Sequence, residues 1–170
     1  MIIDSPILMS ENEIDFLHEF IKNNVSPNGI ILELGSWKGG STIVMASTGR
    51  RVLSVDYWGD TLFQEWKANI TKAGVDHLVI PIRGEDIQVI SPWLPQFGGM
   101  VEFVLIDTSH TYPQTKKEFQ LVYPLVASNG WIFLHDIGHP DYPCCAQAWE
   151  ELKPILRNHT GVQSLLGGQK

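Results

Sequence analysis

Five short apolar runs recur at similar intervals along the chain, and each ends in an acidic or polar cluster. Strands that are apolar throughout are buried on both faces, as in a parallel sheet covered by helices. Parallel strands bring their C-terminal residues to one edge of the sheet, and ligands bind in the crevice there. The sequence therefore predicts a ligand site made of the residues that follow the runs, namely Glu33, Asp56, Gly84, Glu85, Asp86, Asp107, His135 and Asp136.

The segments between the runs have helical patterns. Ser10 and Glu13 form a capping box that begins a first helix. We expect strands at about 29–34, 51–56, 77–82, 101–106 and 130–135, and helices at about 40–48, 60–73, 85–91, 111–128 and 144–157. A helix followed by repeated strand–helix units predicts an α/β fold with a Rossmann-like, doubly wound, mostly parallel sheet.

We expect one domain over residues 1–170, with an N-terminal helical segment (1–28), a cofactor-binding core (29–137), and a loop, last helix and short tail (138–170). In the tail after His159 we expect one further short strand near 161–166.

The composition excludes some partners. The formal net charge is −7 and no segment is dense in Lys and Arg, which argues against a nucleic-acid partner. No apolar stretch is long enough for a membrane span, and the N-terminus lacks the features of a signal peptide. Cys144 and Cys145 are neighbours, which makes a poor disulfide, so we expect reduced thiols and a cytoplasmic protein.

The segment from Glu33 to Thr42 runs from a strand through glycines into a helix. Gly35 permits a tight turn, and a helix N-terminus offers free N–H groups to a ligand. A dinucleotide motif would place a second glycine where Trp37 stands, so the loop suits a nucleoside without a pyrophosphate. Asp56 can accept the ribose hydroxyls, or it can cap the next helix. Glu85 or Asp86 can accept from an exocyclic amine, with helix capping again the alternative.

These motifs resemble a known family. The pattern E-L-G-x-x-x-G-x-S from Glu33 to Ser41, with an acid ending the second strand, resembles class I S-adenosylmethionine-dependent methyltransferases, in particular the catechol O-methyltransferase-like branch. The segments Leu105–Tyr112 and Gly130–Asp136 resemble the methyltransferase 24 family, which includes macrocin-type sugar O-methyltransferases. The resemblance covers about residues 28–137. It implies the strand order 3-2-1-4-5 and a C-terminal hairpin, which the short tail of this chain would leave shortened.

The resemblance implies a set of site residues. The expected cofactor-binding residues are Glu33, Gly35, Ser36, Trp37, Ser41, Asp56, Tyr57, Gly84, Glu85, Asp86 and Asp107. Asp107, His135 and Asp136 occupy the positions that hold a divalent metal, Mg²⁺ or Mn²⁺, in related enzymes. His135 replaces the usual acid, and an imidazole suits a softer metal than magnesium. His110 is the candidate catalytic base, acting beside Asp107, because the pKa of histidine lies near neutrality. It can also orient the following helix.

We therefore expect an O-methyltransferase that uses S-adenosylmethionine and a small hydroxylated acceptor, such as a sugar or natural product, with or without a metal. One alternative is a metal-dependent oxygenase or hydrolase on the same fold. Another is a non-catalytic nucleoside-binding module. The aromatic residues Trp37, Tyr57, Trp58, Trp93 and Tyr112 could wall a substrate pocket or serve a homo-oligomer interface.

Overall fold

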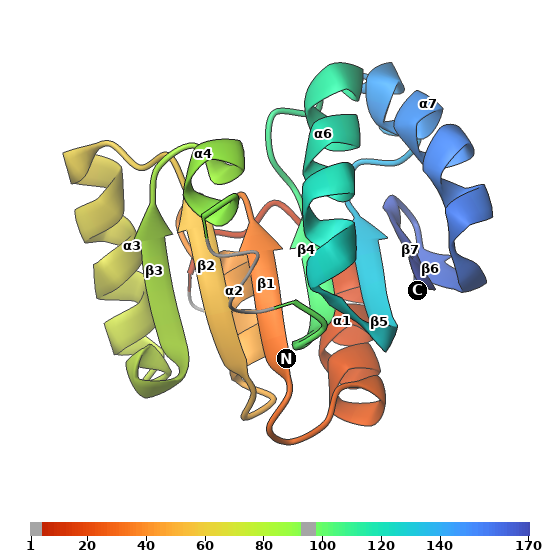
Figure 1. The fold of residues 1–170 in the computed structure, drawn as a ribbon. Helices are drawn as coiled ribbons and strands as arrows, with labels where there is room; N and C mark the ends of the chain where they lie inside the picture. The colour runs from red at the N-terminus through yellow and green to blue at the C-terminus, as the bar shows by residue number, and fades with distance from the viewer. Residues whose placement is uncertain (1–4, 93–97) are drawn as a thin grey trace.

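The computed structural model describes residues 5–92 and 98–170, and seven strands of this part form one sheet (Figure 1). The strands are β1 (Ile30–Leu34), β2 (Arg51–Asp56), β3 (Val79–Arg83), β4 (Val101–Ile106), β5 (Val126–Leu134), β6 (Arg157–Val162) and β7 (Leu165–Gln169). Their order in the sheet is β3-β2-β1-β4-β5-β7-β6. The first five strands pair in parallel, which confirms the predicted order 3-2-1-4-5. β1 lies between β2 and β4, so the chain changes direction across the sheet there, and a crevice is expected at this point.

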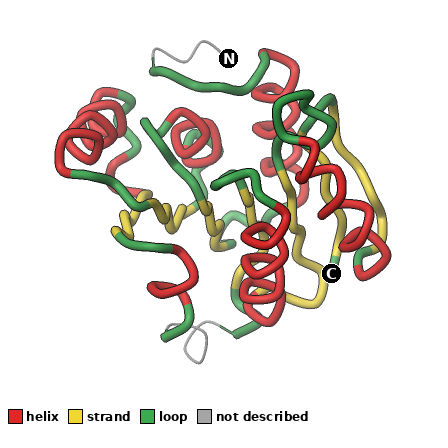
Figure 2. Tube along the Cα trace, turned by 90° about the horizontal axis from the view of Figure 1, so that it is seen from above, coloured by secondary structure: helices red, strands yellow, loops and turns green. Residues whose placement is uncertain are grey.

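Helices cover both faces of the sheet, as the view from above shows (Figure 2). They are α1 (Glu11–Asn24), α2 (Gly40–Ala46), α3 (Asp60–Lys72), α4 (Asp86–Ile90), α6 (Tyr112–Val122) and α7 (Pro143–Leu152), with 3₁₀ turns at Asp76–Leu78, Tyr123–Leu125 and Lys153–Ile155. The first three helices pack on one face, and α4, α6 and α7 pack on the other. Within the described ranges, no helix has the length and apolar character needed to cross a bilayer.

Alternating side chains of the central strands fill both cores. On β4, Phe103 and Leu105 face the α1 side, while Val104 and Ile106 face the α6 side. All four are buried. The continuous apolar runs of the sequence therefore reflect burial on two faces, as predicted.

The C-terminal tail differs from its prediction. A single strand was expected over 161–166, but this range contains the turn between β6 and β7. β7 pairs antiparallel with both β5 and β6, so β6 and β7 form a hairpin that extends the sheet beyond β5. Gln163 takes a left-handed backbone (φ 51°) in the two-residue connection, and this tight turn is why so short a tail can supply two strands.

Two helices end earlier than predicted. α6 ends at Val122 and α7 ends at Leu152, and in each case a 3₁₀ turn containing proline follows. Pro124 and Pro154 lack the N–H that a helix interior needs, which explains both ends. β5 consequently begins at Val126, four residues before the predicted strand.

Candidate active site

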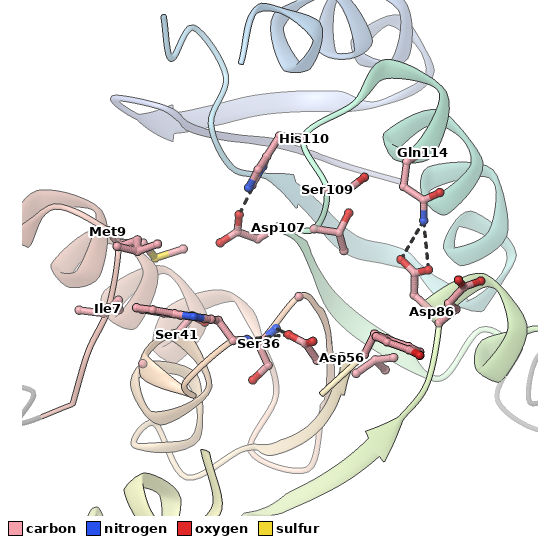
Figure 3. A pocket seen from close by; sticks show the side chains of 18 of the residues that line it. Ile7, Met9, Ser36, Ser41, Asp56, Asp86, Asp107, Ser109, His110 and Gln114 are labelled. Carbon is pink, nitrogen blue, oxygen red and sulfur yellow. Dashed lines mark hydrogen bonds and ion pairs between the residues drawn. The ribbon is translucent and has the colours of Figure 1, made fainter. Parts of the chain in front are cut away.

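A cavity of about 610 Å³ lies at the C-terminal edge of the central strands (Figure 3). Its walls come from the loops that follow β1, β2, β3 and β4, together with the segment before α1. The predicted residues that line it are Gly35, Ser36, Trp37, Ser41, Asp56, Tyr57, Gly84, Glu85, Asp86, Asp107 and His110. The topology thus brings residues from four separate segments to one ligand-sized space.

Asp56 organises the loop after β1. Its Oδ2 accepts the backbone N–H groups of Ser36 (2.9 Å) and Trp37 (2.7 Å). Burial raises the pKa of Asp56, and it outweighs the lowering by these hydrogen bonds. The backbone N–H of Tyr57 also donates to this carboxylate, and Asp56 lines the cavity.

Glu33 lies beneath the loop, which corrects its expected contact with a cofactor. It is fully buried and does not belong to the cavity wall. The hydroxyls of Ser41 (2.5 Å), Thr42 (2.5 Å) and Ser54 (2.8 Å) donate to its carboxylate. Burial raises the pKa of Glu33 despite these bonds. Glu33 therefore supports the loop from within, because three hydroxyls surround its carboxylate.

Asp86, in the wall after β3, is one of a carboxyl pair whose other member, Glu118 of α6, is buried behind the wall; the sequence did not reveal this pair. The Gln114 side-chain amide donates to Asp86 Oδ1 (3.1 Å) and to Glu118 Oε1 (2.7 Å). The Thr108 hydroxyl also donates to Glu118, at 2.7 Å. Burial, followed by the hydrogen bond and charge of Asp86, raises the pKa of Glu118 to about 9. Glu118 therefore carries a proton near neutral pH beside the cavity.

At the other end of the cavity, two carboxylates and two imidazoles converge from the ends of β4 and β5. His110 Nδ1 lies 3.2 Å from Asp136 Oδ2 and 4.0 Å from Asp107 Oδ1. His135 Nδ1 lies 3.2 Å from Asp136 Oδ2 and 3.4 Å from Asp107 Oδ1. The predicted neighbours Asp107, His110, His135 and Asp136 are therefore brought together. His135 and Asp136 lie behind the cavity wall, whereas Asp107 and His110 belong to it.

The electrostatics of this cluster follow from its charges. Burial alone would lower the pKa of His135, but hydrogen bonds and attraction from Asp107 and Asp136 outweigh it and raise the pKa to about 10. Burial would raise the pKa of Asp136, but His135 holds it below its ordinary value. In the absence of another cation, His135 is thus the positive partner of both carboxylates.

Left-handed backbone also concentrates at this edge. Trp37 (φ 45°), His110 (φ 54°) and Asp136 (φ 59°) are non-glycine residues with positive φ, and only two others occur in the described residues. Such conformations cost free energy and persist where surrounding structure fixes them, often at functional sites. At this edge of the sheet, these three residues fix the direction in which their loops enter the site.

The rim aromatics have different roles. Trp37 and Tyr57 line the cavity. Trp58 is buried against Trp66, with ring centroids 4.8 Å apart, and its indole N–H donates to the Trp37 carbonyl. Tyr112 packs against the core on the α6 side, and Trp93 lies outside the described residues. A different aromatic, Tyr142, stacks on His110 with ring centroids 4.3 Å apart.

The segment before α1 forms a wall of the cavity that the sequence did not predict. Pro6, Ile7, Leu8 and Met9 line the cavity across from the strand ends (Figure 3). This segment packs against the first residue of α2, since a β-carbon at Gly40 would lie 2.5 Å from Ile7 Cβ. We call residues 6–9 the roof segment. The only indication of the roof segment in the sequence is a run of apolar residues before the capping box.

The fold and this site define an α/β domain with a ligand-sized cavity at the C-terminal edge of its parallel strands. A family model for a methyltransferase domain, methyltransferase 24, matches residues 32–137. The chain belongs to this family. No curated protein matches the chain significantly.

Solved structures share the fold. An O-methyltransferase from Bacillus cereus in complex with SAH superposes with a TM-score of 0.77 at 17% identity, over 95% of this chain and 82% of that one. The O-methyltransferase TomG from Streptomyces achromogenes, in complex with SAM, gives 0.70 at 19% identity, over 95% and 81%. A methyltransferase from Geobacter sulfurreducens gives 0.75 at 10% identity, over 95% and 79%. At these identities the similarity establishes the fold.

Proposed function

We propose that the protein transfers the methyl group of S-adenosylmethionine to a hydroxyl oxygen of a small acceptor. The observation that carries this proposal is the composition of one cavity. Asp56 and the loop after β1 lie at one end, and Asp107 and His110 lie at the other. The first group suits a nucleoside and the second suits a reacting hydroxyl. Family membership and the SAH and SAM complexes of the structural neighbours agree with it.

The cofactor would lie along the loop after β1. The Asp56 carboxylate, which lines the cavity, would accept the ribose hydroxyls while it also holds the loop. Glu85 and Asp86, in the wall after β3, would accept from the adenine amine. Ser41 and Gly35 would lie beside the remainder of the cofactor, and Asp107 would lie near its methyl end.

His110 would take the proton of the acceptor. Its Nδ1 faces Asp136 at 3.2 Å, so in the neutral ring Nδ1 carries the hydrogen and Nε2 is the free base. A carboxylate that fixes the tautomer and stabilises the imidazolium is a recurring device in enzymes. The stacked Tyr142 ring restricts rotation of the imidazole. His110 and Asp107 are therefore the residues we assign to catalysis.

A divalent metal is a further element of the proposal. The donor atoms of Asp107, His110 and Asp136 lie within 4.8 Å of one another, and His135 Nδ1 lies 3.4 Å from Asp107 Oδ1 and 3.2 Å from Asp136 Oδ2. This donor set fits a divalent cation with nitrogen and oxygen ligands. Such a cation would lower the pKa of an acceptor hydroxyl and orient it.

Calorimetric titration with S-adenosylhomocysteine tests the proposal first. Saturable micromolar binding, lost in Asp56→Ala, is the expected result. A screen of sugars, phenols and other hydroxylated compounds with radiolabelled S-adenosylmethionine then tests methyl transfer. Absence of binding would overturn the cofactor assignment and favour a metal-dependent oxygenase or hydrolase. Binding without transfer to any acceptor would favour a non-catalytic nucleoside-binding module.

A further inference from the structure

A hydrogen-bond network joins the wall after β3 to the buried side of α6. The Gln114 side-chain nitrogen lies 3.1 and 3.3 Å from the two oxygens of Asp86, a contact that Figure 3 shows at the cavity wall. The same nitrogen donates to Glu118 at 2.7 Å. Glu118 lies one turn further along α6 and is fully buried, whereas Asp86 lines the cavity. One amide group therefore holds two carboxyl groups close together, and only one of them faces the cavity.

This network gives Glu118 no positive partner. Within the described part of the chain, the groups that hydrogen-bond it are Gln114, Asp86 and the Thr108 hydroxyl, which lies 2.7 and 2.8 Å from its two oxygens. A buried carboxylate without a cation is costly, and two carboxyl groups in contact do not both ionise readily. Glu118 therefore keeps its proton near neutral pH, in agreement with its raised pKa of about 9. This proton is the hydrogen that Glu118 donates to Asp86.

The other ionisable groups around Glu118 leave this proton in place. On α7, burial and nearby anions, Glu118 among them, raise the pKa of the Cys145 thiol to about 11, so the thiol stays neutral. On α6 itself, Lys116 pairs with Glu151 and Lys117 is exposed. The strand β4 packs apolar side chains against α6. The aspartate at the start of α4 is therefore the charged group coupled to Glu118.

Asp86 differs in this respect from its neighbour Glu85. Both line the cavity, and both are candidates for accepting the adenine amine. Glu85 is exposed and accepts a hydrogen bond from the exposed Gln88 at 2.7 Å. Asp86 is less exposed and is held by Gln114 and by the proton of Glu118. A hydrogen bond is stronger where less water competes for it, so this arrangement favours Asp86 as the acceptor.

We propose that Glu118 is a positioning residue for the cofactor, and that the hydrogen it shares with Asp86 holds this carboxylate against the adenine amine. The cofactor would touch Asp86 and not Glu118, which lies behind the wall. Loss of the proton at alkaline pH would weaken binding, because the shared hydrogen bond is lost and two adjacent negative charges repel. The inference rests on the proposed function, since it requires the nucleoside in this cavity.

The test follows the affinity for S-adenosylhomocysteine across pH. Full-length protein and Glu118→Gln are titrated by calorimetry in steps from pH 6 to pH 9.5. Glutamine keeps an N–H donor for Asp86 and cannot ionise. We expect similar affinities at pH 6–7, and binding about three- to fivefold weaker in the native protein than in the variant at pH 9.5. The amine of the ligand titrates alike in both samples, so the ratio of the two dissociation constants isolates Glu118.

A second readout asks whether the effect reaches the adenine amine. The thioether of homocysteine and purine riboside lacks only the 6-amino group of S-adenosylhomocysteine. At pH 7, the native protein and Glu118→Gln should bind it at least about tenfold more weakly than S-adenosylhomocysteine. Glu118→Leu removes the donor to Asp86 and should reduce this discrimination to about threefold or less. Gln88→Ala, beside Glu85, is the matched control and should discriminate like the native protein.

The possible results separate the role of Glu118 from the proposed function. A ratio of dissociation constants that stays constant to pH 9.5, or full discrimination in folded Glu118→Leu, overturns the role of Glu118. Loss of discrimination in Gln88→Ala alone would assign the amine contact to Glu85 and overturns it as well. If Glu118→Leu does not fold, the pH series on the native protein and Glu118→Gln still decides. Absence of S-adenosylhomocysteine binding in every sample overturns the proposed function, and this inference with it.

Discussion

Gly35 lies directly against the carbonyl oxygen of Asp107, and a β-carbon at Gly35 would stand 1.8 Å from that oxygen. Gly35 also has a left-handed backbone, with φ of +85°. The N–H of Asp107 donates to the carbonyl of Leu34 at 2.8 Å, which holds the two loops together. The loops after β1 and β4, which we propose hold the cofactor and the acceptor, are therefore joined directly through their backbones.

Gly35→Ala should disrupt this contact. Both the strained φ and the clash with backbone oppose a side chain there. Gly49→Ala is the matched control, since Gly49 has the same φ of +85° but no atom within 4 Å of the added carbon. We expect Gly35→Ala to cost about 1–3 kcal/mol more than the control in urea unfolding, the range for overpacking. Equal costs would show that the two loops can separate freely.

Asp56→Ala should weaken S-adenosylhomocysteine binding. The variant removes the acceptor for two loop N–H groups and the predicted ribose contact. A hydrogen bond to a charged group contributes about 1.5–3 kcal/mol, so the dissociation constant should rise by at least about tenfold. Asp60→Ala, an exposed acid in the first turn of α3, is the control. An unchanged dissociation constant in Asp56→Ala would remove the ribose assignment.

The sheet was predictable because its signal is local. The apolar runs predicted five parallel strands, since two buried faces leave little room for polar residues. Their order in the sheet followed from the family resemblance. Most residues that follow the runs do line the cavity, as predicted, because parallel strands end at one edge of the sheet. The strand β6 (Arg157–Val162) was not predicted, because it is an exposed polar edge strand without apolar alternation.

Contacts between distant segments were not predictable. Glu13 reads as a helix cap, and no local pattern reveals that it also contacts Ser164 and His135. Glu33 reads as a ligand contact, but three hydroxyls from α2 and β2 enclose it. In each case the sequence identifies the polar group, and only the fold decides which partners satisfy it.

Glu118 should make stability depend on pH. Its pKa is about 9 in the folded protein, above the ordinary value of a glutamate, so the folded state binds the proton more tightly. The unfolded chain loses this proton near pH 4–5. Stability from this group is therefore complete below that range and decreases as pH rises toward 9, by up to about 1.4 kcal/mol per pH unit.

Glu118→Gln isolates this effect. Glutamine keeps the shape of the protonated acid and cannot ionise. The free energy of unfolding of the variant minus that of the native sequence should increase steadily between pH 5 and pH 8.5 in parallel denaturant titrations, because only the native protein loses stability. Glu65→Gln, at a half-exposed glutamate paired with Lys38, should show no such trend. A constant difference across this range would mean that Glu118 is already ionised at pH 5.

His110→Ala should separate catalysis from cofactor binding. Once an acceptor is known, the variant should lose methyl transfer by about 100-fold or more, the usual contribution of a positioned base. Its affinity for S-adenosylhomocysteine should stay unchanged, because His110 lies at the acceptor end. His139→Ala removes an imidazole that also stacks on Tyr142, at 5.0 Å, and it should retain activity. Retained activity in His110→Ala would mean that another group takes the proton of the acceptor.

The roof segment should control cofactor affinity through Gly40. An alanine there would bring Cβ within 2.5 Å of Ile7 Cβ and of the Pro6 carbonyl oxygen, so residues 6–9 would have to lift from α2. Gly59→Ala is the matched control at the start of α3, where no atom lies within 4 Å of the added carbon.

We expect Gly40→Ala to raise the dissociation constant of S-adenosylhomocysteine by about tenfold, equal to about 1.4 kcal/mol, with a smaller change in global stability. Amide hydrogen exchange should show loss of protection at residues 7–10 in the variant and no change in the control. The roof segment forms a wall of the cavity, so affinity and protection should fall together. If protection falls while affinity stays constant, the cofactor occupies the cavity without touching this wall.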